Sequence, residues 1–383
     1  SMFAEINESV FILPQILVLS RIFHIELYTS AHYTCGAFDR YTPSKIVTSC
    51  GSDMLRISFI NVGYGEAILV EESCDGRSFR LLVDGGKPSG RYHRGEYEGH
   101  PDRVPASRYL EERGIDRLDL LVLTHFHIDH VGGLPDLAER VEIGELWTNY
   151  VVVEPPPDLP PSVAAATTRG ARESLEALGH AARLADIARR RGMPAREIRE
   201  DEFGLCLGRT LSADRFGIVD DIYGRVDSLV RGAYEGPPEA RAASLESLDR
   251  LLNTSCITLR LSYAGRRVLL TADVPSVRWD GIIDAGRSIR SDIMKSPHHG
   301  HADGVSKRLL DAVGPSHFVF CLSEDNDYGC PEPAVFDCLP GAARLYATGQ
   351  VALPPGAAPP APHRAVVFEI DEEGRVESKI ERA

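Results

Sequence analysis

The ten residues THFHIDHVGG, at positions 124–133, carry the strongest signal in the chain. They directly follow the nearly continuous apolar run 118–123, which predicts a strand buried on both faces. Neutral imidazole nitrogens and carboxylate oxygens are the usual protein ligands of Zn²⁺ and similar divalent ions. Several such groups crowded behind a buried strand would be costly without a partner. The segment therefore predicts a metal site built on His125, His127, Asp129 and His130.

The spacing within this segment also predicts which side chains point to the same side and which can turn to a second metal ion. His125 and His127 point to the same side if strand geometry persists beyond residue 123. Asp129 and His130 can turn to a second metal once the chain curves into a following helix. The two glycines at 132–133 let the backbone turn tightly beside the site.

Composition bounds the class of protein. The chain has 383 residues, 43% hydrophobic and 26% charged, which is typical of a soluble globular protein with one large domain or two. A formal net charge of −14 argues against a general nucleic-acid coat or a binder of anionic membranes, although a local basic groove is compatible with it. The eight cysteines form no CxxC pair, which favours reduced thiols. No apolar stretch reaches the ~18–20 residues of a membrane helix, so we expect a cytoplasmic protein without a membrane partner.

Residues 1–53 differ from the rest, with one short apolar run and no sustained period, and we interpret them as an N-terminal extension. Alternating residues from Met54 predict the first strand of the main domain, which spans residues 54–383. The alanine- and leucine-rich stretch 164–191 predicts one or two helices that end at Gly192. We place it within an insertion at about residues 155–250.

The motif HxHxDHxGG resembles the signature of the metallo-β-lactamase superfamily. This resemblance implies an α+β fold, a four-layer αββα sandwich with metals at one edge of its two sheets, here with a helical insertion. LVDGG at 82–86 resembles the segment in which Asp84 orients the ligands, and LTAD at 270–273 resembles the strand that ends in a metal-bridging Asp273. SPHHG at 296–300 resembles the last histidine motif, in which we prefer His298 as the ligand and His299 as its outer partner, or the reverse.

A narrower resemblance, to ComEC-type competence proteins, covers roughly residues 54–350. It is carried by NVGYGEAI at 61–68, NTSC at 253–256, KSPHHG at 295–300 and NDYGCP at 326–331. There are three departures from these families. The usual third histidine of the first metal is not evident, which leaves His125, His127, Asp273 and water. Cys330 stands where the relatives have histidine, and Glu66 replaces an aspartate.

The resemblance implies a hydrolase that uses two divalent ions, with Zn²⁺ favoured and Mn²⁺ also suitable for such ligands. The ions would activate a water by lowering its pKa towards ~7. We expect Asp129 to orient this water, with His299 and His301 as further candidates for the chemistry and His301 as proton donor to the leaving group. The predicted substrate is a phosphodiester, either nucleic acid or a small nucleotide-like molecule, contacted by Lys87, Arg91 and Arg94.

Two other functions stay open at this point. One is acyl or thioester hydrolysis, including β-lactam cleavage. The other is a metal-binding module that has lost catalysis, since a fold alone does not guarantee an activity. A panel of phosphodiester, thioester and lactam substrates would separate these readings.

Overall fold

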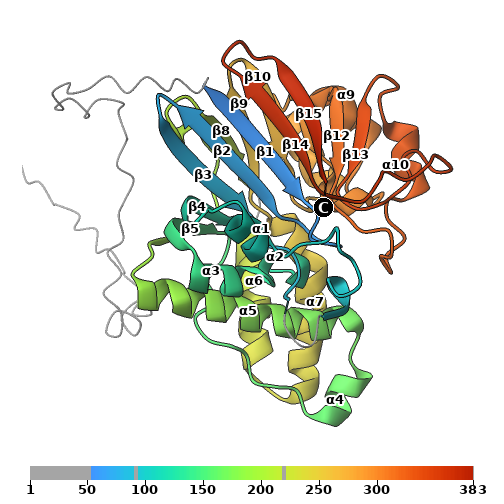
Figure 1. The fold of residues 1–383 in the computed structure, drawn as a ribbon. Coiled ribbons are helices and arrows are strands. Elements are labelled where there is room, and N and C mark those ends of the chain that lie inside the picture. The colour runs from blue at the N-terminus through green and yellow to red at the C-terminus, as the bar shows by residue number, and fades with distance from the viewer. Residues whose placement is uncertain (1–52, 90–93, 218–220, 383) are drawn as a thin grey trace, which may run out of the picture. The chain divides into compact units, whose positions relative to one another are not determined.

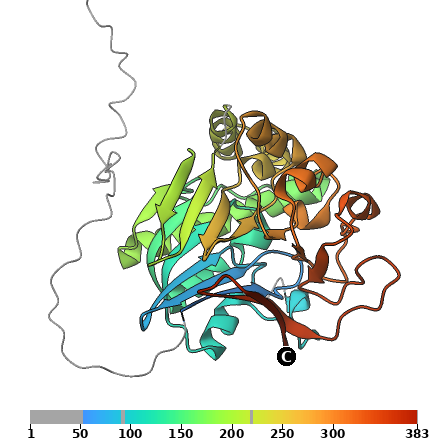
Figure 2. The same cartoon turned by 90° about the horizontal axis from the view of Figure 1, so that it is seen from above.

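The computed structural model describes residues 53–89, 94–217 and 221–382. Its centre is a pair of β-sheets (Figures 1 and 2). The described strands of the first sheet run in the order β15 (Val376–Arg382), β14 (His363–Asp371), β1 (Met54–Ile60), β2 (Ile68–Cys74), β3 (Arg77–Val83), β4 (Arg117–Leu123), β5 (Glu142–Thr148) and β6 (Ala195–Glu197). Those of the second run in the order β13 (Arg344–Ala347), β12 (His317–Phe320), β11 (Ile293–Lys295), β10 (Arg266–Leu270), β9 (Thr258–Tyr263), β8 (Ser212–Phe216) and β7 (Glu202–Cys206).

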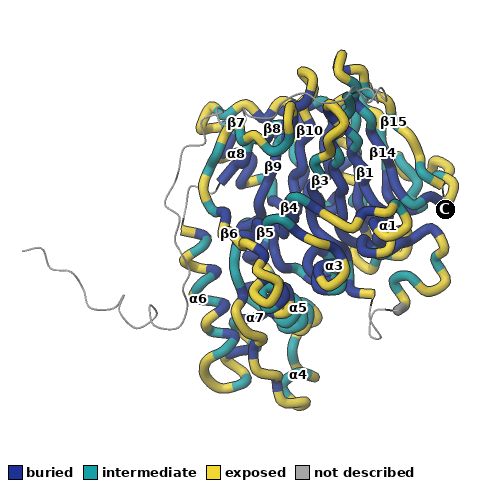
Figure 3. The backbone as a smooth tube through the Cα atoms, turned by 60° about the vertical axis from the view of Figure 1, so that its left-hand side comes forward, coloured by how far each residue is buried: buried dark blue, intermediate teal, exposed yellow. Residues whose placement is uncertain are grey.

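The two sheets share an apolar core. Alternate side chains of β1, such as Leu55 and Ile57, pack in one buried cluster with Leu259 of β9 and Val268 of β10. Burial of this apolar surface is the main force that holds the sheets together. In Figure 3 central strands such as β1 and β14 are mostly buried, whereas the edge strands β6, β7 and β15 are largely exposed. β1 begins at Met54, and the predicted extension over residues 1–53 lies outside the described residues, apart from Asp53.

Helices cover the outer face of each sheet. Those against the first sheet are α1 (Ala106–Glu112), α2 (Ile128–Val131), α3 (Leu134–Arg140), α4 (Pro161–Ala166), α5 (Arg169–Arg191), α6 (Ile222–Tyr234) and α7 (Pro238–Leu252). Those against the second sheet are α8 (Ser276–Asp284), α9 (Lys307–Val313) and α10 (Pro333–Cys338). Three short 3-10 turns complete the description: η1 (Arg94–Glu96), η2 (Asn253–Ser255) and η3 (Pro297–Gly300). The order helix, sheet, sheet, helix confirms the predicted four-layer sandwich. Among the described helices, none has the length and apolar character needed to cross a membrane.

The predicted insertion at about 155–250 is not wholly helical. The stretch 164–191 forms the end of α4 and all of α5, which ends at the left-handed Gly192 as predicted. Between α5 and α6, however, lie strands that extend both sheets: β6 pairs with β5, and β8 pairs with β9. The polar residues of β8 hid this strand in the sequence, because Asp214 is paired with Arg260 of β9. The four helices of this region therefore flank a part of the sandwich itself.

The sheet topology gathers the motifs at one edge. β3 and β4 are parallel neighbours, with Val83 beside Val122, and β10 and β11 are parallel neighbours, with Leu269 beside Met294. Parallel neighbours end at the same edge of a sheet, which is where α/β proteins place their ligands. The segments that hold Asp84, His125–His130, Asp273 and His299 each follow the carboxyl end of one of these four strands.

Candidate metal centre

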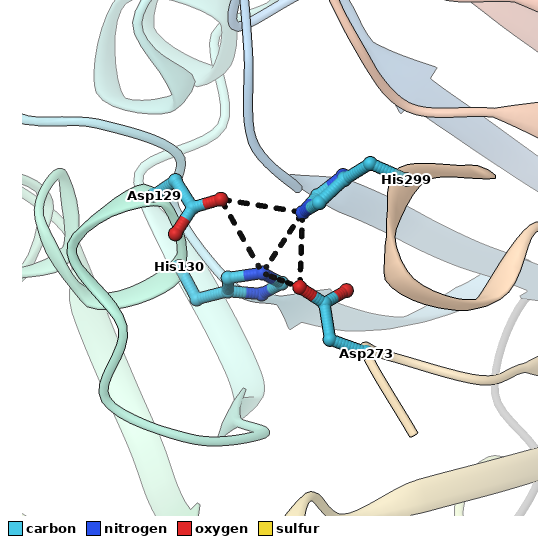
Figure 4. A group of neighbouring side chains, drawn as sticks. All are labelled: Asp129, His130, Asp273 and His299. Atoms are coloured by element: carbon cyan, nitrogen blue, oxygen red, sulfur yellow. Dashed lines mark hydrogen bonds and ion pairs between the residues drawn. The ribbon is translucent and has the colours of Figure 1, made fainter. Parts of the chain in front are cut away.

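Four side chains from three segments converge on one point (Figure 4). Asp129 and His130 lie in the first turn of α2, Asp273 follows β10, and His299 lies in η3. His130 Nε2 is 3.1 Å from Asp273 Oδ2 and 3.3 Å from His299 Nε2. His299 Nε2 is 3.2 Å from Asp129 Oδ2 and 3.1 Å from Asp273 Oδ2. The separation of His130 Nε2 and Asp129 Oδ2 is larger, 3.9 Å.

These distances fit a divalent metal ion. Ligand atoms about 2.0–2.2 Å from a tetrahedral zinc ion are roughly 3.3 Å from one another, because they sit at the corners of a tetrahedron. Four of the five separations given above, at 3.1–3.3 Å, lie close to that spacing. Two imidazoles and two carboxylates are also a donor set that Zn²⁺ and Mn²⁺ accept.

The hydrogen bonds of the two histidines fix which nitrogen faces the cluster. His299 Nδ1 lies 2.6 Å from the carbonyl oxygen of Cys321, which can only accept, so this nitrogen carries the proton. His130 Nδ1 lies 2.8 Å from Asp84 Oδ2 and donates to that carboxylate. When an ion is bound and Nε2 carries no proton, these tautomers point their Nε2 lone pairs at the cluster. Such outer partners orient the imidazole and raise its basicity as a ligand.

His125 and His127 form a second pair beside this cluster. His125 Nε2 is 3.0 Å from His127 Nδ1, and the rings of His125 and His130 are 4.2 Å apart. His127 Nε2 donates to the carbonyl oxygen of Asp249, at 3.1 Å, which leaves the Nδ1 lone pair facing His125. His125 Nδ1 is 3.0 Å from Thr124 Oγ1, whose own proton goes to Asp84 Oδ2. Both inner nitrogens are therefore free to share one ion.

The two groups differ in the number of ligand atoms that lie close together. No group of three potential ligand atoms found among the described residues includes His125 or His127. The structure thus does not group Asp273 with His125 and His127, and the use of Asp273 as a third protein ligand of the first metal stays a prediction. His180, the one histidine between residues 133 and 273, lies in α5 near Glu176 and joins no such group.

Charge at the centre favours a cation. Burial raises the pKa of Asp273, but the neighbouring charges of His299 and Lys295 outweigh burial and hold this pKa well below its usual value. Burial lowers the pKa of His130, but Asp273 and Asp129 outweigh burial and raise this pKa well above its usual value. The carboxylates of Asp129 and Asp273 are thus ionised, and a divalent ion bound beside them would replace the proton that they favour on His130.

Comparison with known proteins shows the family of the chain. The sequence profile of the metallo-β-lactamase superfamily matches residues 60–323. This range includes the histidine segment at 125–130, Asp273 and His299. The chain belongs to the metallo-β-lactamase superfamily. It is similar to ComE operon protein 3 of Bacillus subtilis (strain 168), with 21% identity over 294 residues, 76% of this chain and 31% of that protein. The chain thus spans less than a third of that relative. The solved metallo-β-lactamase fold protein YhfI from Bacillus subtilis covers 85% of this chain and 100% of its own, with 11% identity and a TM-score of 0.39.

In the last histidine motif we preferred His298 as the ligand and His299 as its outer partner, and the structure reverses this preference. The structure places His299 in the cluster, whereas His298 points elsewhere. Nε2 of His298 is 3.0 Å from Asn253 Nδ2, and Nδ1 is 2.7 Å from Asp303 Oδ1. Both ring nitrogens of His298 thus have protein partners, so it offers no lone pair to an ion. The geometry favours His299 as the ligand.

The backbone of η3 explains the reversal. His298 and His299 both have left-handed backbones, with φ of 47° and 51°, which non-glycine residues seldom adopt. Two successive left-handed residues turn the chain sharply. The simple alternation that predicts side-chain direction in a strand therefore fails after Lys295, the last residue of β11.

Two other predicted residues, Lys87 and His301, lie around the rim of the cluster. Lys87 Nζ is 3.1 Å from Glu96 Oε2 and 5.2 Å from the ring of Tyr64, and that ring is 4.8 Å from the ring of His299. His301 is outside the cluster, with Nε2 3.4 Å from the Tyr64 hydroxyl and Nδ1 3.0 Å from Glu332. Arg91 and the side chain of Arg94 lie outside what the structure describes. The contact of these arginines with substrate stays a prediction.

Cys330, which stands in place of the relatives' histidine, is buried near Tyr64. Burial, followed by the charge of Glu332, raises the pKa of the Cys330 thiol to about 12. The thiol is therefore protonated at neutral pH and is a poor nucleophile.

Sequence reasoning missed the residues that support the ligands. Asp249, in α7, holds His127 through its carbonyl oxygen, and its carboxylate Oδ1 lies 3.5 Å from the same ring nitrogen. Glu66 and Lys295 form a fully buried ion pair that reaches Asp273. A lysine at the end of an apolar strand was the only signal in the sequence for that pair.

Asp84→Asn tests the orienting role predicted for Asp84. This buried carboxylate accepts from Thr124 N, Thr124 Oγ1 and His130 Nδ1, at 2.8, 2.7 and 2.8 Å. An amide oxygen can keep at most the two bonds to Oδ2, and its NH₂ group would face the N–H of Thr124, so the group that orients His130 is displaced and loses its charge. We expect zinc affinity, measured by competition with a chelator, to fall about 10–100-fold. Asp119→Asn, at a half-buried carboxylate on β4, should leave the affinity unchanged. Wild-type affinity in a folded Asp84→Asn variant would refute the role.

Proposed function

We propose that the protein is a metal-dependent phosphodiesterase or nuclease. The observation that carries this proposal is the pairing of two neighbouring ligand groups, each with its lone pairs turned inward. His125 and His127 would hold one ion, and Asp129, His130, Asp273 and His299 the other. Zn²⁺ is favoured, and Mn²⁺ also suits these ligands.

Two adjacent divalent ions suit a phosphodiester well. When bound, they would supply a nucleophile at neutral pH and stabilise the charge that develops on phosphorus-bound oxygens. The chain's own residues would orient the attacking water and supply a proton to the leaving group. We assign to Asp129 the orientation of the attacking water, because its carboxylate lies at the edge of the cluster with 13% of its side chain exposed. Most other members of the cluster are fully enclosed.

His301 is the proposed proton donor to the leaving group. Glu332 accepts from Nδ1 of His301 and so directs Nε2 towards Tyr64, whose ring packs against His299. Burial lowers the pKa of His301, so donation from Nε2 requires the ring to take up a second proton, and Glu332 stabilises that charged form. A donor in this place would act on an atom at the rim of the cluster rather than within it. This position suits a leaving group better than the attacking water.

The rim offers groups that suit a nucleotide-like substrate. Tyr328 is 36% exposed and stacks on Tyr64, with ring centroids 4.5 Å apart. The guanidinium of Arg169, at the start of α5, lies 5.1 Å from the centre of the Tyr328 ring. Aromatic rings and cations together bind bases and phosphates. The net charge of −14 favours a short or small phosphodiester over a long polynucleotide.

A substrate panel tests the proposal. The purified protein, loaded with Zn²⁺ or Mn²⁺, would be offered bis(4-nitrophenyl) phosphate, short single-stranded DNA, RNA, a thioester and a β-lactam. We expect metal-dependent cleavage of the phosphodiesters only. Asp129→Ala should lower this rate by at least about 100-fold, because an ion ligand contributes several kcal/mol to the transition state.

Asp136→Ala, a change at a surface aspartate of α3 that pairs with Arg183, is the matched control and should keep the wild-type rate. Turnover of the thioester or the lactam alone would replace the proposal by acyl hydrolysis. Metal uptake without turnover of any substrate would indicate a binding module.

A further inference from the structure

Lys295 lies at the end of β11 with no exposed surface, directly behind the candidate metal centre. Its ammonium group has three hydrogen atoms to donate. Nζ is 3.0 Å from Asp273 Oδ1 and 2.9 Å from the carbonyl oxygen of Ala272, and it also forms an ion pair with Glu66 Oε2. The three donors are thus matched by three acceptors, and the side chain has a single, defined position.

These contacts divide the two oxygens of Asp273. Oδ1 is occupied by Lys295, whereas Oδ2 lies 3.1 Å from both His130 Nε2 and His299 Nε2. A free carboxylate could turn about its last bond and offer both oxygens to one ion. The bond to Lys295 prevents that rotation, because it would break a charge-assisted hydrogen bond in a buried site.

Lys295 also holds the backbone that presents Asp273. Ala272 has a φ of 47°, in the left-handed region that is unfavourable for a residue with a Cβ atom. Its carbonyl oxygen accepts from both Lys295 Nζ and the backbone nitrogen of His298, at 2.9 and 3.2 Å. These two bonds fix the turn between β10 and Asp273.

Glu66 links this lysine to the other sheet. Its carboxylate is fully buried, and its backbone nitrogen donates to the carbonyl oxygen of Asp129, at 3.1 Å. Its own carbonyl oxygen accepts from Gly86, at 2.8 Å. Glu66 therefore contacts the Asp84 turn, the histidine segment and Lys295 together. Its Oε1 atom is buried and makes no hydrogen bond among the described residues, so the pair is not arranged for maximum stability.

We propose that Lys295 and Glu66 are positioning residues that restrict Asp273 to one-oxygen coordination of the metal ion. Lys295 occupies Oδ1 and leaves Oδ2 for the ion, and Glu66 fixes the lysine and balances its charge. Buried ion pairs contribute little net stability compared with apolar residues of the same size, which favours a positional role. The proposal rests on the metal-binding part of the proposed function and not on the identity of the substrate.

The experiment measures metal binding without any substrate. Three variants are compared with the wild type: Lys295→Met, Glu66→Gln, and the double change of both residues. Zinc affinity is measured by chelator competition, coordination by the visible spectrum of the Co²⁺-loaded protein, and stability by thermal unfolding of the metal-free protein. Lys307→Met, at a lysine of α9 whose side chain is 73% exposed, is the control.

The double variant separates a positioning role from a structural one. Lys295→Met leaves the buried Glu66 charge unpaired, and Glu66→Gln leaves Lys295 with Asp273 alone, so each single change should lower the unfolding temperature. The double change also takes Lys295 from Asp273 but removes the unpaired Glu66 charge, so it should recover part of the loss seen in Lys295→Met. A positioning role predicts that zinc affinity stays about 10–100-fold below the wild type in the double variant, with an altered Co²⁺ spectrum. Lys307→Met should match the wild type in all three measurements.

Two results would overturn the proposal. One is a folded double variant with wild-type zinc affinity and Co²⁺ spectrum. The other is a double variant that does not fold, because the pair would then be required for the fold itself. If zinc binding depends on Lys295 and Glu66 as proposed, but the wild-type protein cleaves no phosphodiester, the proposed activity is contradicted and this inference stands.

Discussion

Replacing His299 by alanine is expected to abolish metal binding at the four-ligand group and to lower hydrolysis by about 10³-fold, whereas His298→Ala keeps both within about tenfold of the wild type. The difference follows from the partners of the two rings. His299 presents an Nε2 lone pair to Asp129, His130 and Asp273, whereas both nitrogens of His298 are bound by Asn253 and Asp303. A 10³-fold loss corresponds to roughly 4 kcal/mol of transition-state stabilisation.

The two histidines are neighbours in one motif, so each variant serves as the control for the other. Bound metal per chain would be measured by elemental analysis after dialysis, and kcat/KM with bis(4-nitrophenyl) phosphate. Equal effects of the two substitutions, or a larger effect of His298→Ala, would contradict the assignment of His299 as the ligand.

Removal of the metal is expected to have a comparable effect on activity and a second effect on stability. A chelator should lower the rate by at least about 10³-fold, and Zn²⁺ or Mn²⁺ should restore it. An ion that binds only the folded protein stabilises it by about 4.1 kcal/mol when present at a thousand times its dissociation constant. We therefore expect zinc to raise the unfolding temperature by several degrees.

The same titration in His299→Ala provides the control for this second prediction. Because the variant lacks one of the four ligands, zinc should shift its unfolding temperature much less. If the chelator changes neither the activity nor the unfolding temperature of the wild type, the centre binds no functional ion.

The positions of most ligands could be predicted from the sequence because they depend on local patterns. The apolar run 118–123 predicts a buried strand, and the histidines that follow it must then lie at an edge of the sheet. Asp84 and Asp273 each follow an apolar run in the same manner. That these segments meet at one edge of the two sheets was implied by the resemblance to the metallo-β-lactamase superfamily, and no local pattern in the sequence predicts it.

Other features depend on contacts between distant residues and could not be predicted. The order of His298 and His299 is set by two left-handed residues, a conformation that no spacing rule indicates for histidine. The pair of Glu66 and Lys295 joins the loop after β1 to the end of β11. Strand β8 was hidden by the polar pair Asp214 and Arg260, whose partnership exists only once the sheet has formed.

Anomalous diffraction from crystals of the zinc-loaded protein, collected above and below the zinc absorption edge, tests the central claim most directly. We predict a strong peak at about 2.0–2.2 Å from His130 Nε2, His299 Nε2 and one oxygen each of Asp129 and Asp273. A zinc ion bound elsewhere, or bound by His298 in place of His299, would contradict the account.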